Sequence, residues 1–144
     1  MLDLEDNMDT PSEIQERIIR EIEQAGDPFD QFDYLLVKAA ELPEMPEERK
    51  AADVLVKDCQ SQVWLYLHEV DGRPLIEADS DTLMIRGTIQ ILKELFDGQP
   101  PQAVVDCEVS YIQRTDLAYA FDSKRVAGQA AIVARIKDFA RSLV

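Results

Sequence analysis

Cys59 is the residue of this chain whose type and setting could support covalent chemistry. It stands in the stretch Asp58–Val70, DCQSQVWLYLHEV, at the predicted connection between two strands. A thiolate is the reactive form of cysteine, so a working cysteine needs access and groups that stabilise negative charge. The backbone N–H groups around Ser61 and the amides of Gln60 and Gln62 could donate hydrogen bonds to sulfur there. From the residues alone, a structural thiol remains the other interpretation.

The remaining nucleophilic and metal-binding residues offer little to complete a catalytic site. His68, the single histidine, lies nine residues beyond Cys59, more than about 15 Å away if the intervening chain is a regular strand. A cysteine hydrolase that uses His68 as its base is therefore disfavoured. Cys107 follows the sequence AVVD and is interpreted as a filler of apolar space. Two cysteines and one histidine, without CxxC or HxxxH spacing, predict no metal site.

Two helices are predicted in the first third of the chain. Thr10 and Glu13 form a capping-box pattern around Pro11, and the apolar spacing that follows is helical. A second helix is predicted over residues 28–42, where another proline stands at the first helical position. We expect its apolar side chains to be buried: Phe29, Phe32, Leu35, Leu36 and Ala39.

The middle of the chain predicts three β-strands, at residues 53–58, 62–70 and 73–79. These stretches are rich in β-branched and aromatic residues. Asp71-Gly72, between the second and third, is a hairpin signal. The three strands are expected to form a small antiparallel sheet.

Helices are predicted again in the last part of the chain. Ser80 is the expected N-cap of a long helix over residues 81–96, whose apolar residues are too numerous for a narrow stripe. Short helical pieces are expected at 101–106 and 109–115. A final helix is expected from about Ser123, with its apolar residues on one face.

This order of elements defines the fold class and the domain organisation. It predicts an α+β domain with helices on one face of a three-stranded antiparallel sheet. Residues 10–144 are expected to form one domain, and the acidic residues 1–9 to be disordered. No apolar run approaches the roughly 20 residues of a membrane span. The acidic N-terminus resembles neither a signal nor a transit peptide, so we expect a cytoplasmic protein.

The charge of the chain argues against nucleic acid as a partner. The formal net charge is −14, and 17 of the 29 acidic residues lie in residues 1–58. This acidic half is interpreted as a solvated surface that could also steer a basic protein partner. Lys124 and Arg125 oppose the dipole of the last helix. A salt bridge to the acidic half, or stabilisation of an anionic sulfur, would explain them.

Five stretches, taken in order, resemble the SufE family of sulfur-acceptor proteins. They are CQSQVWL (59–65), DSD (79–81), Gly87, DGQPPQAVV (97–105) and SKRVAGQAAIV (123–133). CQSQVW is the most specific of them. The resemblance extends from about Tyr34 to the C-terminus.

The resemblance implies a specific function. Proteins of this family take sulfur from a pyridoxal-phosphate cysteine desulfurase of the SufS type, stimulate it, hold the sulfur as a persulfide and pass it to a SufB-containing scaffold for iron–sulfur clusters. Cys59 matches the persulfide-forming cysteine, and Asp81 and Arg125 match positions associated with partner binding or sulfur stabilisation. The family implies a SufE/IscU-like fold, a carrier that is not an enzyme and has no cofactor of its own, and a monomer or weak homodimer.

One residue departs from the family pattern. Asp58 stands where family members usually have glycine, and a carboxylate beside a thiol disfavours the thiolate, although Lys57 could offset its charge. An interaction or regulatory module that has lost sulfur transfer is therefore the first alternative. An iron–sulfur scaffold is the second, and the shortage of cysteine ligands counts against it.

Overall fold

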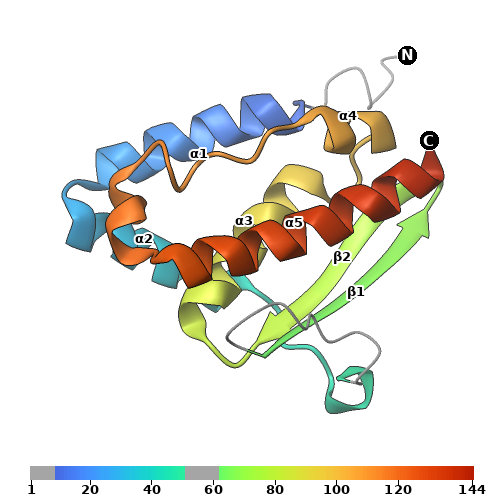
Figure 1. Cartoon of the computed structure of the whole chain (residues 1–144), viewed down its shortest axis with the longest axis horizontal. Helices are drawn as coiled ribbons and strands as arrows, with labels where there is room; N and C mark the ends of the chain where they lie inside the picture. Colours follow the sequence, from blue (N-terminus) through green and yellow to red (C-terminus); the bar gives the residue numbers. More distant parts are fainter. Residues whose placement is uncertain (1–8, 51–61) are drawn as a thin grey trace.

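The computed structural model describes residues 9–50 and 62–144, in which helices pack on one face of a β-hairpin (Figure 1). In this view α5 crosses in front of α3, α1 runs along the top, and the hairpin lies at the lower right. The elements are α1 (Pro11–Ala25), α2 (Pro28–Glu41), the 3₁₀ helix η2 (Glu47–Arg49), β1 (Val63–Val70), β2 (Arg73–Ser80), α3 (Leu83–Phe96), α4 (Pro101–Asp106), the 3₁₀ helix η4 (Asp116–Ala120) and α5 (Ser123–Leu143).

The first two helices begin where the capping patterns predict. The Thr10 hydroxyl accepts a hydrogen bond from the Glu13 N–H, and the Glu13 carboxylate accepts one from the Thr10 N–H, each 3.1 Å long. Asp27 and Asp30 form the same reciprocal pair at the start of α2. Each box satisfies two N–H groups that a helix start leaves without intrahelical partners.

The buried face of α2 differs from the prediction. Leu35 and Ala39 are buried as expected, but Phe29 is 82% exposed. The buried stripe continues toward the N-terminus through Gln31, which is 3% exposed. Phe29 is two residues before Gln31, which places it about 200° around the helix, on the opposite side. The prediction that Phe29 is buried was wrong because a polar glutamine occupies the core-facing position.

Gly87 allows α2 and α3 to pack closely. A Cβ atom at this position would overlap the backbone carbonyl oxygen of Leu35 and lie 2.8 Å from its Cγ and Cδ1 atoms. The residue is fully within α3. The glycine of the sequence pattern is therefore required by the contact between two helices.

Gly87→Ala is expected to lower the free energy of unfolding by about 1–3 kcal/mol, as overpacking of a well-packed core usually does. The added methyl meets a backbone atom of Leu35, which cannot rotate away, so α2 and α3 must separate. Urea denaturation followed by circular dichroism measures the change. An unchanged midpoint and slope would show that the two helices accommodate the methyl without cost.

The hairpin forms with the register that Asp71-Gly72 predicts. Both turn residues have positive φ, 54° and 77°, as a two-residue type I′ turn requires. Pairs such as Leu65–Ala78 and Leu67–Ile76 lie on one face of the sheet and pack into the core. The other face carries Trp64, Tyr66, His68 and Glu77. The helices therefore cover one face, as predicted for an α+β domain.

The structure describes two of the three predicted strands. The predicted strand 53–58 lies outside the described residues and stays a prediction. The outer edge of β2 is closed, because Asp97 accepts from the Ile76 N–H, Lys93 donates to the Ile76 carbonyl, and the Gly98 N–H donates to Pro74. An open groove of about 430 Å³ separates β1 from the C-terminal half of α5. A third strand would have to pair with β1.

The later helices follow the prediction except at two points. The N-cap of α3 is Thr82, not Ser80, and no helix forms at 109–115, where residues 111–114 are a turn that precedes η4. Asp122 caps α5 by accepting from the Arg125 N–H at 2.9 Å. All five α-helices and both strands contribute to one hydrophobic core. None of the described helices is both long and apolar enough to cross a membrane.

Candidate functional site

The structure describes the residues on both sides of the predicted persulfide site, up to residue 50 and from residue 62. Cys59, Asp58, Gln60 and Ser61 lie outside the described residues, so the structure does not test their roles. Gln62 is described and exposed. Cys59 precedes Gln62 by three residues, and a chain of that length spans at most about 11 Å. The contacts of Gln62 therefore describe the border of the segment that contains the thiol.

Asp81 and Ser80 hold Gln62 in place. The Gln62 N–H donates to the Asp81 carboxylate at 3.2 Å. The Gln62 carbonyl accepts from the Ser80 hydroxyl at 2.7 Å and from the Asp81 N–H at 3.3 Å. The structure thus brings together two residues predicted for the site, Gln62 and Asp81, by a direct contact. It also explains why Ser80 is not the helix cap: its hydroxyl donates to Gln62 and accepts from the Thr82 N–H.

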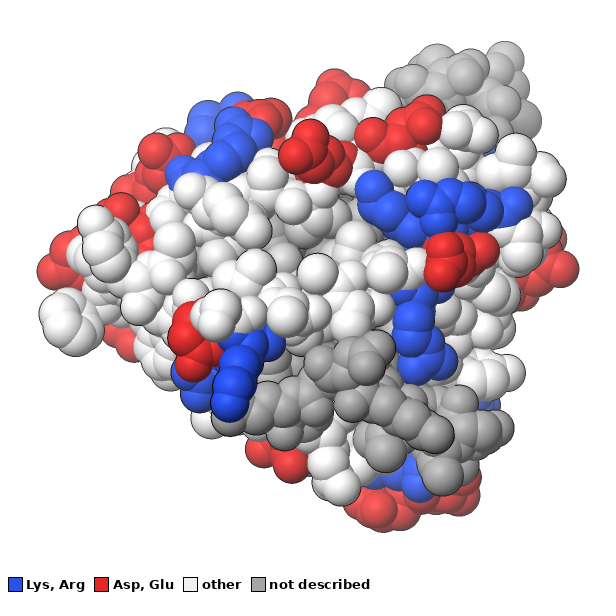
Figure 2. Space-filling model, in the orientation of Figure 1, with Lys and Arg blue, Asp and Glu red and all other residues white. Residues whose placement is uncertain are grey.

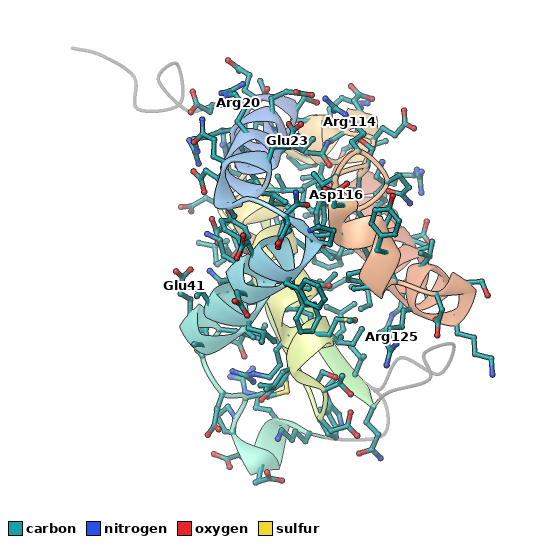
Figure 3. All side chains as sticks on the ribbon, turned by 90° about the vertical axis from the view of Figure 1, so that its left-hand side faces the viewer. Arg20, Glu23, Glu41, Arg114, Asp116 and Arg125 are labelled. Carbon is teal, nitrogen blue, oxygen red and sulfur yellow. The ribbon has the colours of Figure 1, made fainter. Side chains whose placement is uncertain are left out.

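Arg125, the other predicted site residue, lies in the first turn of α5. Its side chain is 42% exposed and its guanidinium is 3.7 Å from the carboxylate of Asp122. Figure 3 shows Arg125 across the molecule from Glu41, near the start of α5. No hydrogen bond or ion pair in the described ranges links Arg125 to Asp81 or Gln62. Among the described residues its ionic partner is the cap of its own helix, and no acid of residues 9–50 forms an ion pair with it.

Several basic side chains elsewhere on the described surface are also paired. On the face over α5, Lys and Arg lie in small groups beside Asp and Glu (Figure 2). Arg114 forms a two-point ion pair with Glu16 on α1, at 2.6 and 2.9 Å, and lies near Asp116 in Figure 3. Such exposed pairs contribute little to stability.

A buried ion pair beside the site was missed by the sequence analysis. Asp79 is 2% exposed and accepts from the N–H groups of Met45, at 3.0 Å, and Ser80, at 2.7 Å. Its carboxylate also binds the guanidinium of Arg86, which donates at 2.6 Å to the Leu42 carbonyl. Arg86, a charged residue among apolar neighbours in the first turn of helix 83–96, was the signal that could have revealed it.

The surroundings of Asp79 favour its charged form. Burial alone would raise the pKa of the Asp79 carboxyl, but the N–H groups of Met45 and Ser80 and the Arg86 guanidinium outweigh burial and lower that pKa. The ammonium of Lys50 lies 3.9 Å from the same carboxylate. Asp79 is therefore an anion at neutral pH.

Asp79→Asn is expected to make the free energy of unfolding depend less on pH in the acid range. Because folding lowers the pKa of Asp79, its contribution is present above the unfolded value of about 4 and is lost as the pH falls through the folded value. The wild type should therefore lose more unfolding free energy than Asp79→Asn between about pH 6 and pH 3. Urea denaturation at a series of pH values measures this. Parallel curves would mean that the Asp79 carboxylate does not contribute.

Two basic side chains, from the residues just before residue 51, cover the outer face of β1. The Lys50 ammonium lies 4.7 Å from the centre of the Trp64 ring, and the Arg49 guanidinium lies 5.1 Å from that of Tyr66. Trp64 is half-buried and Tyr66 is 37% exposed. The two aromatic rings therefore bind the side chains of residues 49 and 50 by cation–π contacts. The alternating pattern of the strand in the sequence did not reveal these contacts.

The other nucleophilic candidates lie apart from the site. His68 faces Glu77, with its Nε2 atom 3.8 Å from the Glu77 carboxylate, and stacks on Tyr66. Cys107 is 1% exposed, and burial raises the pKa of its thiol, a shift that a Ser12 hydrogen bond and Lys137 partly offset. Cys107 fills apolar space, as expected, and its thiol is suppressed as a nucleophile.

The fold defines the class of the protein before any comparison by sequence. It is an α+β domain whose helices cover one face of an antiparallel hairpin, with a polar turn at the hairpin's open end. The same fold occurs in the solution structure of a hypothetical protein from Thermus thermophilus, with a TM-score of 0.75. That match covers 94% of this chain and 98% of the other, at 18% sequence identity.

The chain belongs to the SufE family. The model of the SufE Fe–S metabolism associated domain matches residues 16–140, which is most of the chain. An uncharacterized SufE-like protein of Synechocystis sp. is 28% identical over 112 residues, covering 78% of this chain and 70% of the relative. The family assigned from the sequence motifs is confirmed, and it associates the chain with iron–sulfur metabolism.

Proposed function

We propose that this protein is a sulfur carrier that accepts a persulfide sulfur on Cys59 from a cysteine desulfurase, stimulates that enzyme, and passes the sulfur to an iron–sulfur cluster scaffold. The observation that carries the proposal is the CQSQ sequence at residues 59–62 in a SufE-family domain. The anchoring of Gln62 to Asp81 supports it, because it ties this motif to the DSD turn. We further propose a SufS-type desulfurase as the donor and a SufB-containing scaffold as the acceptor.

The proposed transfer is a thiol exchange that needs no cofactor on this chain. The Cys59 thiolate attacks the outer sulfur of the desulfurase persulfide, and a new S–S bond forms as the old one breaks. The electron pair of the broken bond leaves with the desulfurase cysteine as its thiolate. The number of S–S bonds is unchanged, so no external oxidant or reductant is required.

The proposal predicts stimulation of the donor enzyme. A SufS-type cysteine desulfurase, supplied with cysteine, should release alanine faster when this protein is added, because a second thiol clears the persulfide from its active site. Alanine release measured against protein concentration tests this. A rate that does not change at any concentration would contradict the proposed function.

Asp58→Gly is expected to speed alkylation of Cys59 by iodoacetamide at neutral pH. Removing the neighbouring carboxylate favours the thiolate, which is the form that reacts. The rate is best measured in a Cys107→Ser background, so that one thiol is followed. An unchanged rate would mean that Asp58 has no influence on the thiol, and would remove the reason for considering a module without sulfur transfer.

A further inference from the structure

The segment between α2 and residue 51 is held to the end of β2 by a buried ion pair. Arg86 donates to the Leu42 carbonyl at 2.6 Å and to the Ala39 carbonyl at 3.4 Å, while its guanidinium also binds Asp79. Asp79 in turn accepts from the Met45 N–H at 3.0 Å. One guanidinium and one carboxylate thus join the end of α2, the chain that follows it, β2 and α3.

The same turn also holds the two described ends that border residues 51–61. On one side, Lys50 rests on Trp64, with its ammonium 3.9 Å from the Asp79 carboxylate. On the other side, Gln62 is bound by the carboxylate and the N–H of Asp81, two residues after Asp79. Both described residues that border the segment containing Cys59 therefore contact the Asp79–Asp81 turn.

Stability is a weak reason for a buried ion pair at this place. Removing two charges from water carries a large desolvation penalty, and well-packed apolar residues of similar volume often stabilise a fold equally well. The Asp79 and Arg86 side chains are only 3% and 14% exposed. What an apolar pair lacks is direction: the planar guanidinium binds a carboxylate and two carbonyl groups in one geometry.

We propose that Asp79 and Arg86 are positioning residues for sulfur transfer. They hold the residues that border the Cys59-bearing segment, so that its thiol meets a donor persulfide in a reactive geometry. This inference rests on the proposed function. Small displacements of reacting groups lower rates strongly. If the residues that border the segment become mobile, sulfur transfer should therefore slow even when the fold survives. In this proposal the pair acts through the chain that it holds, as a positioning element and not as a reacting group.

The test compares variants that loosen this pair with a control that breaks a different one. Arg86→Lys keeps the positive charge but loses the planar set of guanidinium donors, and Asp79→Asn loses the negative charge. Lys38→Met is the control, because it removes the 3.0 Å pair between α2 and Glu94 of α3, which does not involve residues 42–50. The kcat/KM for sulfur uptake from a SufS-type desulfurase should fall by about tenfold or more in both test variants. Lys38→Met should match the wild type.

Stability and activity are separated by measuring both in each variant. Urea denaturation establishes that each variant is folded under the assay conditions. If Arg86→Lys and Asp79→Asn take up sulfur as fast as Lys38→Met, the positioning role is overturned. Arg86→Lys keeps the proposal testable if Asp79→Asn fails to fold.

Alkylation of Cys59 in the free protein distinguishes this inference from the proposed function. In a Cys107→Ser background, Arg86→Lys and Asp79→Asn should react with iodoacetamide at an altered rate, and Lys38→Met at the wild-type rate. If the wild type takes up no sulfur, the proposed function fails, together with transfer as the purpose of the pair. Equal alkylation rates in all four proteins would overturn the positioning role itself.

Discussion

Cys59→Ser is expected to abolish both sulfur uptake and stimulation of the desulfurase. A hydroxyl oxygen cannot hold a sulfur atom as a persulfide, and exchange requires an attacking thiolate. Serine is close in size to cysteine, so the surface offered to the donor enzyme is preserved. Alanine release by a SufS-type desulfurase, with cysteine as substrate, should stay at the rate of the enzyme alone.

Cys107→Ser is the matched control for this prediction. Cys107 is buried in the core, with its thiol pKa raised by burial, so it should not take part in exchange. Stimulation should therefore survive in Cys107→Ser, provided that urea denaturation shows a folded protein. Full stimulation by Cys59→Ser would instead favour the interaction module without sulfur transfer.

Arg86→Met is expected to lower the free energy of unfolding by about 3–5 kcal/mol, the usual cost of removing one partner from a buried ion pair. The variant leaves the Asp79 carboxylate buried without its guanidinium and the Leu42 carbonyl without its donor. Urea denaturation near neutral pH measures the loss. The effect should be smaller at low pH, where Asp79 is protonated.

The double variant Asp79→Asn with Arg86→Met shows whether the pair acts as a unit. With both charges removed, the double variant should lose less stability than the sum of the two single variants. Strict additivity, or a loss for Arg86→Met as small as that for an exposed ion pair, would contradict the structural role assigned to Arg86.

Elements specified by neighbouring residues could be predicted from the sequence. The capping pattern of Thr10 and Glu13 and the turn at Asp71-Gly72 act over two to four positions, and both are present in the structure. The family was equally accessible, because CQSQVW is a contiguous and specific string. These features need no knowledge of how distant parts of the chain pack.

Features that depend on packing between distant segments could not be predicted. Phe29 is exposed and Gln31 buried because Gln31 forms hydrogen bonds with Asp116, 85 positions further along the chain. Ser80 has the residue type of a helix cap, but Gln62, eighteen positions earlier, takes its hydroxyl. The contact of Arg86 with Leu42 spans 44 positions, and no local pattern encodes it.

The candidate site also contains residues that the sequence motifs identified and residues whose role depends on distant contacts. Cys59 and Asp81 were identified by motif, and the structure adds that Asp81 holds the residue three positions after the cysteine. Asp79 stands in the same DSD string, where helix capping offered a sufficient explanation. Its burial and its bond to Arg86 give it a different role, because it holds the chain before residue 51 to the turn whose Asp81 binds Gln62.

Intact-mass spectrometry after incubation with a SufS-type desulfurase and cysteine, without reductant, tests sulfur transfer to Cys59 most directly. The wild type and Cys107→Ser are expected to gain the mass of one sulfur atom, which peptide mapping places on Cys59. Cys59→Ser is expected to gain nothing. A wild type that gains no mass while the desulfurase turns over, or a gain that persists in Cys59→Ser, would contradict the proposed function.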